Sequence, residues 1–306
     1  MHQAKTNSAI LVDKVSKSYG DTLALNQISL NVEPGELFGL IGPDGAGKTT
    51  LFRILVTLLL PDNGEAWVDG AHVVHQYQDI RRQVGYMPGR FSLYQDLSVQ
   101  ENLSFFATIF GTTIEENYHL IKDIYVQLEP FKKRLAGNLS GGMKQKLALC
   151  CALIHKPTVL FLDEPTTGVD AVSRKEFWVM LDQLKQNGIT ILVSTPYMDE
   201  AGLCDRIALM QDGELLTVNR PEQLIEDYQH PLYAVKADNF YRLLAILRDK
   251  TYTKSVLPFG DSLHLTTNRQ LLTDELVNSL KEEIGEVQIS QIKATVEDVF
   301  LDLSSG

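Results

Sequence analysis

The residues best suited to chemistry lie in one glycine-rich stretch, which reads Gly-Pro-Asp-Gly-Ala-Gly-Lys-Thr at positions 42–49. Glycines at these spacings let the backbone turn its N–H groups inward onto an anion, and the lysine and hydroxyl that follow complete a cradle for a nucleoside triphosphate. In this pattern Lys48 reaches the β- and γ-phosphates, and the Thr49 hydroxyl is a ligand for Mg²⁺. The residues predicted to bind the nucleotide are Gly42, Pro43, Asp44, Gly45, Ala46, Gly47, Lys48, Thr49 and Thr50.

The segments on either side have the patterns needed to position such a loop. An apolar run at 37–41 predicts a buried strand that enters the loop, and the apolar spacing of 49–55 predicts a helix that leaves it. The amino-terminal end of that helix carries partial positive charge, which favours a bound phosphate. A plain glycine-rich turn beside a surface lysine would explain the loop alone, but not both of its flanks.

A second apolar strand, at 158–162, ends in two carboxylates, Asp163 and Glu164. At the tip of the strand Asp163 is placed to hold the Mg²⁺ shell, and Glu164 is placed to polarise an attacking water as a general base. A strand that ends in an ordinary polar turn is the alternative. The phosphate-binding loop upstream favours the catalytic interpretation.

A third feature is the start of a long helix at Ser140, Gly141 and Gly142. A serine and two glycines at a helix start form another anion site. Because one phosphate loop already serves one nucleotide, the second anion site indicates a ligand shared with another subunit. Residues 166–170, directly after the carboxylate pair, are candidates for contact with that opposing subunit.

Composition limits the remaining possibilities. The chain has 306 residues, which suggests one large and one smaller domain, and its net charge of −11 gives no support to a role in coating nucleic acid. Its three cysteines show no metal-binding spacing and suit a reducing compartment. The first eight residues have no signal-peptide core, and no apolar run approaches the roughly 18–20 residues of a spanning helix. We therefore expect a cytoplasmic chain that needs a separate membrane partner for any transport role.

Apolar strands that alternate with helices predict an α/β fold with a mostly parallel sheet. Short strands at 9–12 and 28–32 precede the loop, and residues 98–150 are expected to be mostly helical, beginning with a capping box of Ser98 and Glu101. After residue 229 the order strand, helix, strand, strand, helix, strand predicts a small split-βαβ, ferredoxin-like domain over 230–306.

With these motifs in this order, residues 9–225 resemble the ATP-binding subunits of ATP-binding-cassette (ABC) transporters. The resemblance implies a P-loop ATPase core over 1–229, with an N-terminal antiparallel β subdomain and a helical subdomain over about 90–150 that contacts a permease. It also implies a head-to-tail dimer in which Ser140, Gly141 and Gly142 of one chain close over Mg-ATP held by the other chain. Tyr19 would stack on adenine.

The tail around 294–300 looks like the C-terminal extension of ABC-2-type exporter subunits, which pair with separate permeases and often export drugs or antibiotics. The resemblance therefore implies a peripheral position on the cytoplasmic face of the inner or plasma membrane, and a homodimer or a heterodimer with another ABC ATPase domain. The smaller domain is left as regulatory, a dimer contact or a spacer.

Two positions depart from the family pattern. Gly89 stands where the family has a glutamine that contacts metal and water, and Pro196 stands where it has a histidine that contacts the γ-phosphate. Neither Gln95 nor His155 is a good substitute by position. Because both losses affect the site built on Lys48, Asp163 and Glu164, we expect that site to be weakened, whereas the Ser140 segment is intact.

Two other functions stay open. One is a nucleotide-binding structural or regulatory partner of a second, complete ATPase, with no useful hydrolysis of its own. The other is a soluble cassette ATPase that acts on ribosomes or DNA. Such proteins usually carry two cassettes or a long coiled coil, and this sequence has one cassette and no sustained heptads.

Overall fold

The computed structural model describes residues 8–304, and the chain divides into two compact units between Pro221 and Glu222. The expected domains over 1–229 and 230–306 stay a prediction. Residues 1–7, which the signal-peptide argument used, lie outside the described part. Within 8–304, no helix combines the length and the apolar character that a membrane crossing requires.

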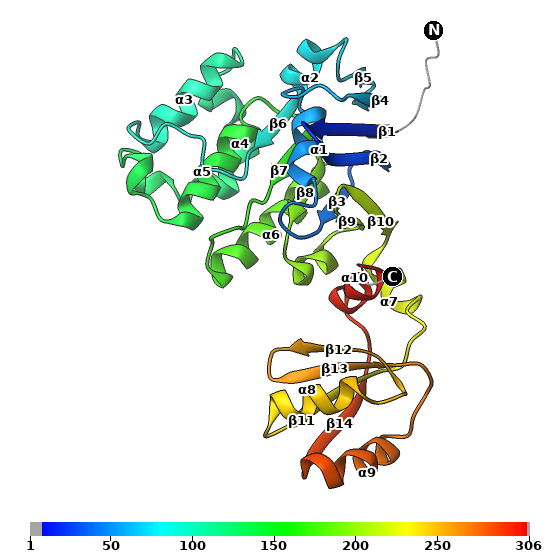
Figure 1. The fold of residues 1–306 in the computed structure, drawn as a ribbon. Coiled ribbons are helices and arrows are strands. Elements are labelled where there is room, and N and C mark those ends of the chain that lie inside the picture. The colour runs from blue at the N-terminus through cyan, green and yellow to red at the C-terminus, as the bar shows by residue number, and fades with distance from the viewer. Residues whose placement is uncertain (1–7, 305–306) are drawn as a thin grey trace. The chain divides into compact units, whose positions relative to one another are not determined.

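A six-stranded sheet forms the centre of the first unit, in the order β10-β9-β3-β8-β7-β6 (Figure 1). All neighbours are parallel except β9 and β10. Every residue of β3, β7 and β8 is buried, which is why apolar residues dominate these strands and their polar residues lie at the strand ends. The predicted mostly parallel sheet is confirmed. Its strands are β3 Leu37–Ile41, β6 Val84–Met87, β7 Val159–Asp163, β8 Thr190–Thr195, β9 Arg206–Gln211 and β10 Glu214–Asn219.

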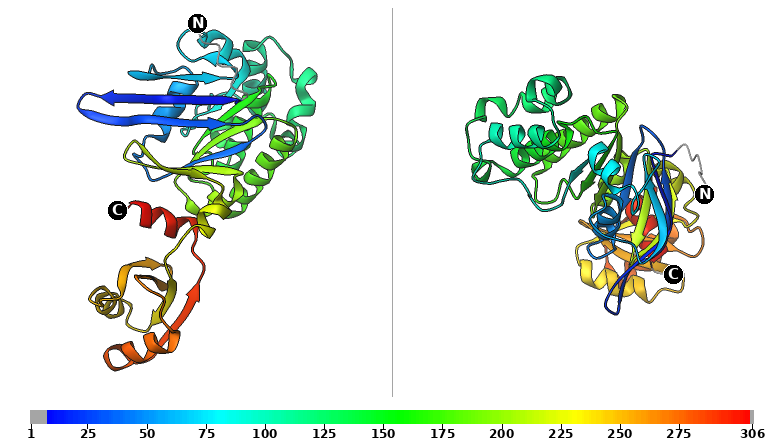
Figure 2. Two further views of the ribbon diagram at one scale, coloured as in Figure 1. Left: turned by 90° about the vertical axis from the view of Figure 1, so that its right-hand side faces the viewer. Right: turned by 90° about the horizontal axis from the view of Figure 1, so that it is seen from above.

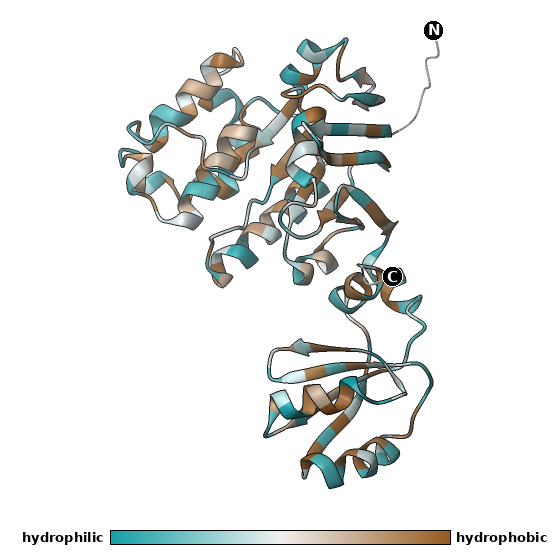
Figure 3. Ribbon diagram, in the orientation of Figure 1, coloured by the Kyte–Doolittle hydropathy of each residue, from teal (hydrophilic) through white to brown (hydrophobic). Residues whose placement is uncertain are grey.

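The second sheet of this unit is antiparallel, in the order β2-β1-β4-β5. Strands β1 and β2 form one long hairpin (Figure 2), and both are longer than the sequence suggested. The apolar run at 10–12 covers only the start of β1, and the rest of that strand is mostly polar (Figure 3), so the apolar runs marked only part of each strand. Irregular pairing beside Lys14 and Gln27, both at positive φ, bends the hairpin. The strands are β1 Ile10–Tyr19, β2 Thr22–Val32, β4 Asn63–Val68 and β5 Ala71–His72.

The helices of the first unit fall into two sets. Helix α1 packs against β7 and α6 against β3 and β8, whereas α3, α4 and α5 pack on one another as a separate group (Figure 1). The capping box predicted at the start of α3 is confirmed, because Ser98 and Glu101 each accept the other's backbone N–H. The helices are α1 Lys48–Leu55, α2 Tyr77–Gln83, α3 Val99–Ile109, α4 Ile114–Tyr125, α5 Gly141–Leu153 and α6 Ala171–Gln186, with short 3-10 turns η1 Glu129–Phe131, η2 Ala136–Asn138 and η3 Met198–Leu203. Helix α7, Pro221–Glu226, begins at the last residue of the first unit and continues into the second.

The second unit is an antiparallel sheet of order β12-β13-β11-β14 that carries two helices, the predicted split-βαβ topology. It has its own hydrophobic core, in which the buried Tyr233 donates its hydroxyl to the Leu271 carbonyl at 2.7 Å. Its elements are β11 Leu232–Ala237, α8 Phe240–Arg248, β12 Thr253–Phe259, β13 Ser262–Thr267, α9 Thr273–Ile284, β14 Val287–Ile292 and α10 Val296–Ser304.

Candidate nucleotide-binding site

The glycine-rich loop joins β3 to α1, as predicted, and its backbone requires glycine at several positions. Gly45 and Gly47 have φ of 84° and 101°, a conformation that costs other residues energy. Gly42 has an ordinary φ but no space, because a Cβ atom there would lie 2.1 Å from the Met210 carbonyl oxygen of β9. The loop is therefore held tightly against the sheet on one side and open on the other.

Gly42→Ala should destabilise the protein much more than Gly45→Ala. The first change pushes a methyl group into the backbone of β9, which we expect to cost about 3 kcal/mol. The second meets no atom within 4 Å, so only its left-handed backbone is penalised, by about 1–2 kcal/mol. Urea unfolding followed by circular dichroism measures both. Equal unfolding midpoints for the two variants would contradict the close contact with β9.

Lys48 is buried at the mouth of this loop. Its ammonium donates to the carbonyl oxygens of Gly42 and Pro43, at 2.8 and 3.0 Å, and lies 3.2 Å from Glu164 Oε1. The loop's own carbonyls therefore hold the cation in place, paired with the carboxylate from the end of β7. A phosphate oxygen that entered the loop would meet a fixed positive charge.

Thr49 and Asp163 come together as the sequence predicted. The Thr49 hydroxyl donates to Asp163 Oδ1 at 3.1 Å, and the Ser194 hydroxyl donates to the same oxygen at 2.8 Å. A hydroxyl beside a carboxylate is the type of oxygen pair that Mg²⁺ accepts, so these residues fit the expected metal. Burial raises the pKa of the nearby Tyr86 to about 12, and the charge of Asp163 adds to that shift.

Glu164 lies directly beyond this pair with an unusual backbone, at φ 50°. Its N–H donates to both the carbonyl and the hydroxyl oxygen of Ser194, at 3.1 and 3.0 Å, and these two bonds offset the strain of a left-handed residue. Strand β8 thereby sets the positions of both acidic residues. This role of Ser194 was not predicted from the sequence, although its place at the end of a buried strand is a usable signal.

The two departures lie next to these carboxylates. A Cβ atom at Gly89 would be 3.0 Å from the Asp163 carbonyl oxygen and 3.8 Å from the Glu164 Cβ. Pro196 directly follows β8, two residues after Ser194. A side chain at position 89 would therefore begin beside the carboxylates, position 196 follows the strand end that holds them, and neither residue supplies a polar side chain.

The two residues considered as substitutes make contacts elsewhere. The Gln95 side chain lies beside Gly137 in the helical group. The His155 ring stacks on Phe110 at 3.8 Å and its Nε2 lies 3.1 Å from the Val84 carbonyl oxygen. Burial lowers the pKa of His155, so the neutral ring is favoured.

Ser140 caps α5, accepting the Met143 N–H at 3.4 Å. The two glycines that follow rest on the segment after the carboxylates. A Cβ atom at Gly142 would lie 2.7 Å from Ser173 Oγ, and one at Gly141 would lie 3.5 Å from the Gly168 carbonyl oxygen. The predicted second anion site therefore packs against residues 166–170 and the start of α6.

Tyr19 is the last residue of β1, and its side chain is 47% exposed. The preceding residues are anchored, because Asp62 accepts the Ser18 N–H at 2.7 Å and the Lys17 ammonium. The hydrogen bond from Lys17 holds the pKa of Asp62 below its usual value. An exposed ring on an anchored strand end suits stacking on a base.

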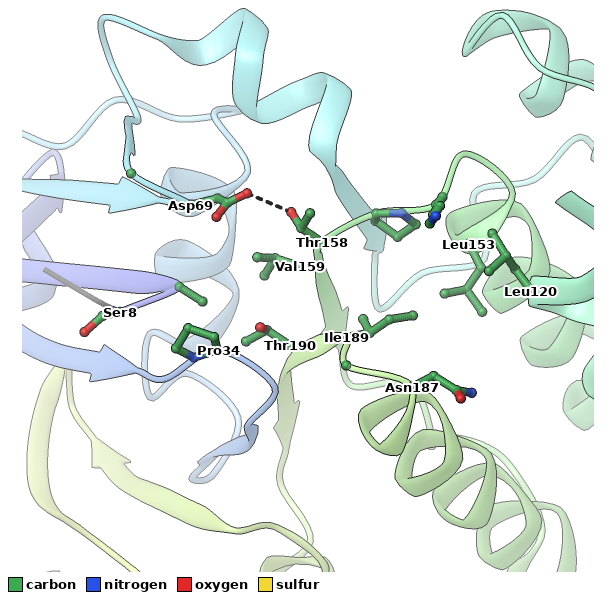
Figure 4. Close-up of a pocket in the computed structure, with 15 residues that line it drawn as sticks. Ser8, Pro34, Asp69, Leu120, Leu153, Thr158, Val159, Asn187, Ile189 and Thr190 are labelled. Atoms are coloured by element: carbon green, nitrogen blue, oxygen red, sulfur yellow. Dashed lines mark hydrogen bonds between the residues drawn. The ribbon is translucent and has the colours of Figure 1, made fainter. Parts of the chain in front are cut away.

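A hollow of about 590 Å³ lies at the other edge of the parallel sheet, where β7 and β8 begin (Figure 4). Pro34, Val159 and Thr190 line it, and the Thr158 hydroxyl donates to Asp69 at its rim, at 3.1 Å. None of the predicted site residues lines it, so we place the candidate site at the loop and the carboxylates.

Comparison with known proteins agrees with this geometry. The family profile described as ABC transporter matches residues 25–167. The Nod factor export ATP-binding protein I of Rhizobium sp. (strain N33) is 35% identical over 300 residues, 97% of each chain. The chain belongs to the ABC transporter family.

Other proteins similar to this chain include a longer relative and two solved structures. The probable multidrug ABC transporter ATP-binding protein YbhF of Escherichia coli (strain K12) is 37% identical over 290 residues, which are 94% of this chain and 50% of that protein. This chain thus spans about half the length of that relative. Among solved structures, cbiO1 of Clostridium perfringens aligns with a TM-score of 0.65 at 26% identity, over 72% of this chain and 92% of that one. The cassette MJ0796, solved as a dimer bound to ADP and Pi, aligns with a TM-score of 0.63 at 26% identity, over 69% and 98%.

Proposed function

We propose that this cassette is the ATP-binding and ATP-hydrolysing subunit of a membrane exporter. The observation that carries the proposal is the convergence of Lys48, Thr49, Asp163 and Glu164 at the end of β7, with one ion pair and one hydrogen bond joining the loop to the carboxylates. Bound Mg²⁺ supplies a Lewis acid that neutralises charge on the transferring phosphate. The family membership and the names of two relatives, one a multidrug and one an export ATP-binding protein, support the exporter role.

Each residue has a distinct part in this chemistry. Lys48, fixed by two carbonyls, binds the β- and γ-phosphates. Thr49 and Asp163 would hold Mg²⁺, the first through its hydroxyl and the second through its carboxylate. When the nucleotide binds, its phosphates replace Glu164 as the partner of Lys48. Glu164 is then free to orient and deprotonate the attacking water. Tyr19 stacks on the adenine ring.

The full site in this proposal needs a second cassette, whose serine and glycines close over the nucleotide. Because Gly89 and Pro196 leave this chain's own site without two polar side chains, a heterodimer fits better than a homodimer. This chain would hold ATP with slow or no turnover and would lend Ser140, Gly141 and Gly142 to the working site of a complete ATPase. A homodimer with slow turnover and a purely structural ATP-binding partner are the two nearest alternatives.

A groove beside the site suits the membrane partner. It holds about 340 Å³ and lies between the end of β6 and the helical group, lined by apolar side chains that include Met87, Leu93 and Phe106. It reaches Pro88, the residue before Gly89, so a segment docked there would touch the edge of the nucleotide site. We assign it to an apolar helical segment of an ABC-2-type permease, which would hold the chain at the cytoplasmic face of the membrane.

The arrangement is tested by two substitutions in the complex purified with its partners from native membranes. Ser140→Arg should abolish steady-state ATP hydrolysis, because it blocks the anion site lent to the working nucleotide. Glu164→Gln in this chain should lower hydrolysis by less than about twofold, since the working site uses the partner's own glutamate. If both substitutions abolish hydrolysis equally, the two sites are equivalent and the asymmetric arrangement is wrong.

A further inference from the structure

Glu200 is a buried acid that the proposed chemistry does not use. It lies in η3, is 2% exposed, and contacts the end of β8 just before it and two segments farther back in the sequence. Its Oε2 accepts the Thr195 hydroxyl at 2.5 Å and the Thr166 hydroxyl at 3.2 Å. Its Oε1 lies 3.8 Å from Arg174 Nε of α6, which is a charge contact too long to be a hydrogen bond.

A carboxylate buried to this degree is costly unless charges and hydrogen bonds compensate for the water it has lost. The two threonines are themselves almost fully buried, so their hydroxyls also depend on this partner. Removing the carboxylate would leave two buried donors without it and would leave Arg174 with its exposed neighbour Asp199, at 3.7 Å. The Glu200 carboxylate therefore links the three segments that carry Thr166, Arg174 and Thr195.

Both threonines lie beside the candidate site. Thr195 is the last residue of β8 and follows Ser194, which holds Asp163 and the Glu164 N–H. Thr166 lies two residues after Glu164, at the start of the segment 166–170. Glu200 therefore fastens the chain after Glu164 to the end of the strand that positions Glu164.

Pro196 makes the hydrogen bond between Glu200 and Thr195 more important. A proline has no N–H, so residue 196 gives no backbone hydrogen bond to order the turn after β8. The Thr195 hydroxyl replaces it, because it accepts the Tyr197 N–H at 3.1 Å while it donates to Glu200. The Thr195 side chain thus closes the turn 195–200 together with the backbone bond from the Glu200 N–H to the Tyr197 carbonyl, at 3.2 Å.

We propose that Glu200 is a positioning residue for Glu164, acting through Thr195 and Thr166. This inference rests on the proposed function, since Glu164 is the general base only there. A role limited to fold stability would predict the same contacts, so the experiment must separate local placement of Glu164 from general destabilisation.

The experiment uses the full chain with Glu200→Ala, Thr195→Val and Thr195→Ser, and Asp298→Asn as the matched control. Asp298 is also buried, at 5% exposure, and also accepts a threonine hydroxyl, and its Oδ1 lies 2.7 Å from His264 Nδ1, but it lies in the second unit. For each variant we would measure hydrogen exchange over 164–170, Mg-ATP affinity and the single-turnover rate of hydrolysis.

We expect Glu200→Ala and Thr195→Val to raise exchange over 164–170 and to slow the single turnover by on the order of tenfold, the size expected when a buried hydrogen-bonding group loses its partner. Mg-ATP affinity should change by less than about threefold. Thr195→Ser, which keeps the hydroxyl, should behave as the original chain, and Asp298→Asn should leave exchange over 164–170 unchanged.

Exchange that rises evenly across the whole sheet, or a Thr195→Ser variant as impaired as Thr195→Val, would overturn the proposal. Failure of the proposed function would give a different result, because the unsubstituted chain would then not bind Mg-ATP at all. The exchange measurement on the nucleotide-free chain would still decide whether Glu200 fastens these segments.

Discussion

Replacing Pro196 with histidine should raise the single-turnover rate of ATP hydrolysis at this chain's own site by on the order of a hundredfold or more, because a positioned donor to the transferring phosphate contributes roughly 3–4 kcal/mol. The position is prepared for such a side chain. Ser194 and Thr195 before it are fully buried and hydrogen-bonded, so the backbone that would carry the histidine is already fixed. The measurement is rapid-quench release of phosphate from radiolabelled ATP with protein in excess.

The control is the same variant with Glu164→Gln, which should remove the gain. Adding Gly89→Gln should help further, but only after a small shift, because a Cβ atom there would lie 3.0 Å from the Asp163 carbonyl oxygen. If Pro196→His leaves the rate unchanged while Mg-ATP still binds, the slow step lies outside these two positions, and the explanation of a weakened site fails.

Lys48→Ala should reduce Mg-ATP affinity by on the order of a hundredfold to a thousandfold, since truncating one partner of a hydrogen-bonded charge pair between protein and ligand costs about 2–5 kcal/mol. The substitution acts twice: it removes the cation that faces the phosphates, and it leaves Glu164 at the mouth of the loop without its partner at 3.2 Å. The remaining negative charge then repels the nucleotide. Isothermal titration calorimetry with Mg²⁺ and a non-hydrolysable ATP analogue measures the loss while Glu164 is kept.

The matched control for this loss is Lys185→Ala. That lysine also pairs with carboxylates, Asp182 at 3.2 Å and Asp205 at 3.0 Å, but it lies on the surface of α6. Its removal should change Mg-ATP affinity by less than about twofold, because surface ion pairs contribute little. Equal effects of the two substitutions would show that net charge, and not the loop, governs binding.

The sequence predicted the parts of the site that depend on local pattern. The loop 42–49, the strand that enters it and the helix that leaves it are contiguous, so spacing alone identified them. Asp163 and Glu164 were found in the same way, because a buried strand ends at them. The approach of Thr49 to Asp163 could be expected from the shared edge of a parallel sheet, where strand ends meet, whereas the ion pair of Lys48 with Glu164 was not predicted.

What the sequence did not reveal depends on residues far apart in the chain. Gly42 needs to be glycine because of a carbonyl on β9, and no local pattern announces which strand lies beside the loop. Ser194 and Glu200 are placed by the order of β3, β8 and β7 in the sheet, which spacing does not specify. The long hairpin of β1 and β2 was underestimated because its solvent face is polar and its bends interrupt the alternation.

The close packing of Gly142 on Ser173 has a mechanical consequence if two cassettes clasp ATP as proposed. The helix cap that presses on one nucleotide stands directly on the stretch of chain behind the other nucleotide's carboxylates. Because position 142 has no side chain, the start of α5 lies directly against the start of α6, so a displacement of one is transmitted to the other. The two nucleotide sites of such a dimer would therefore open and close together.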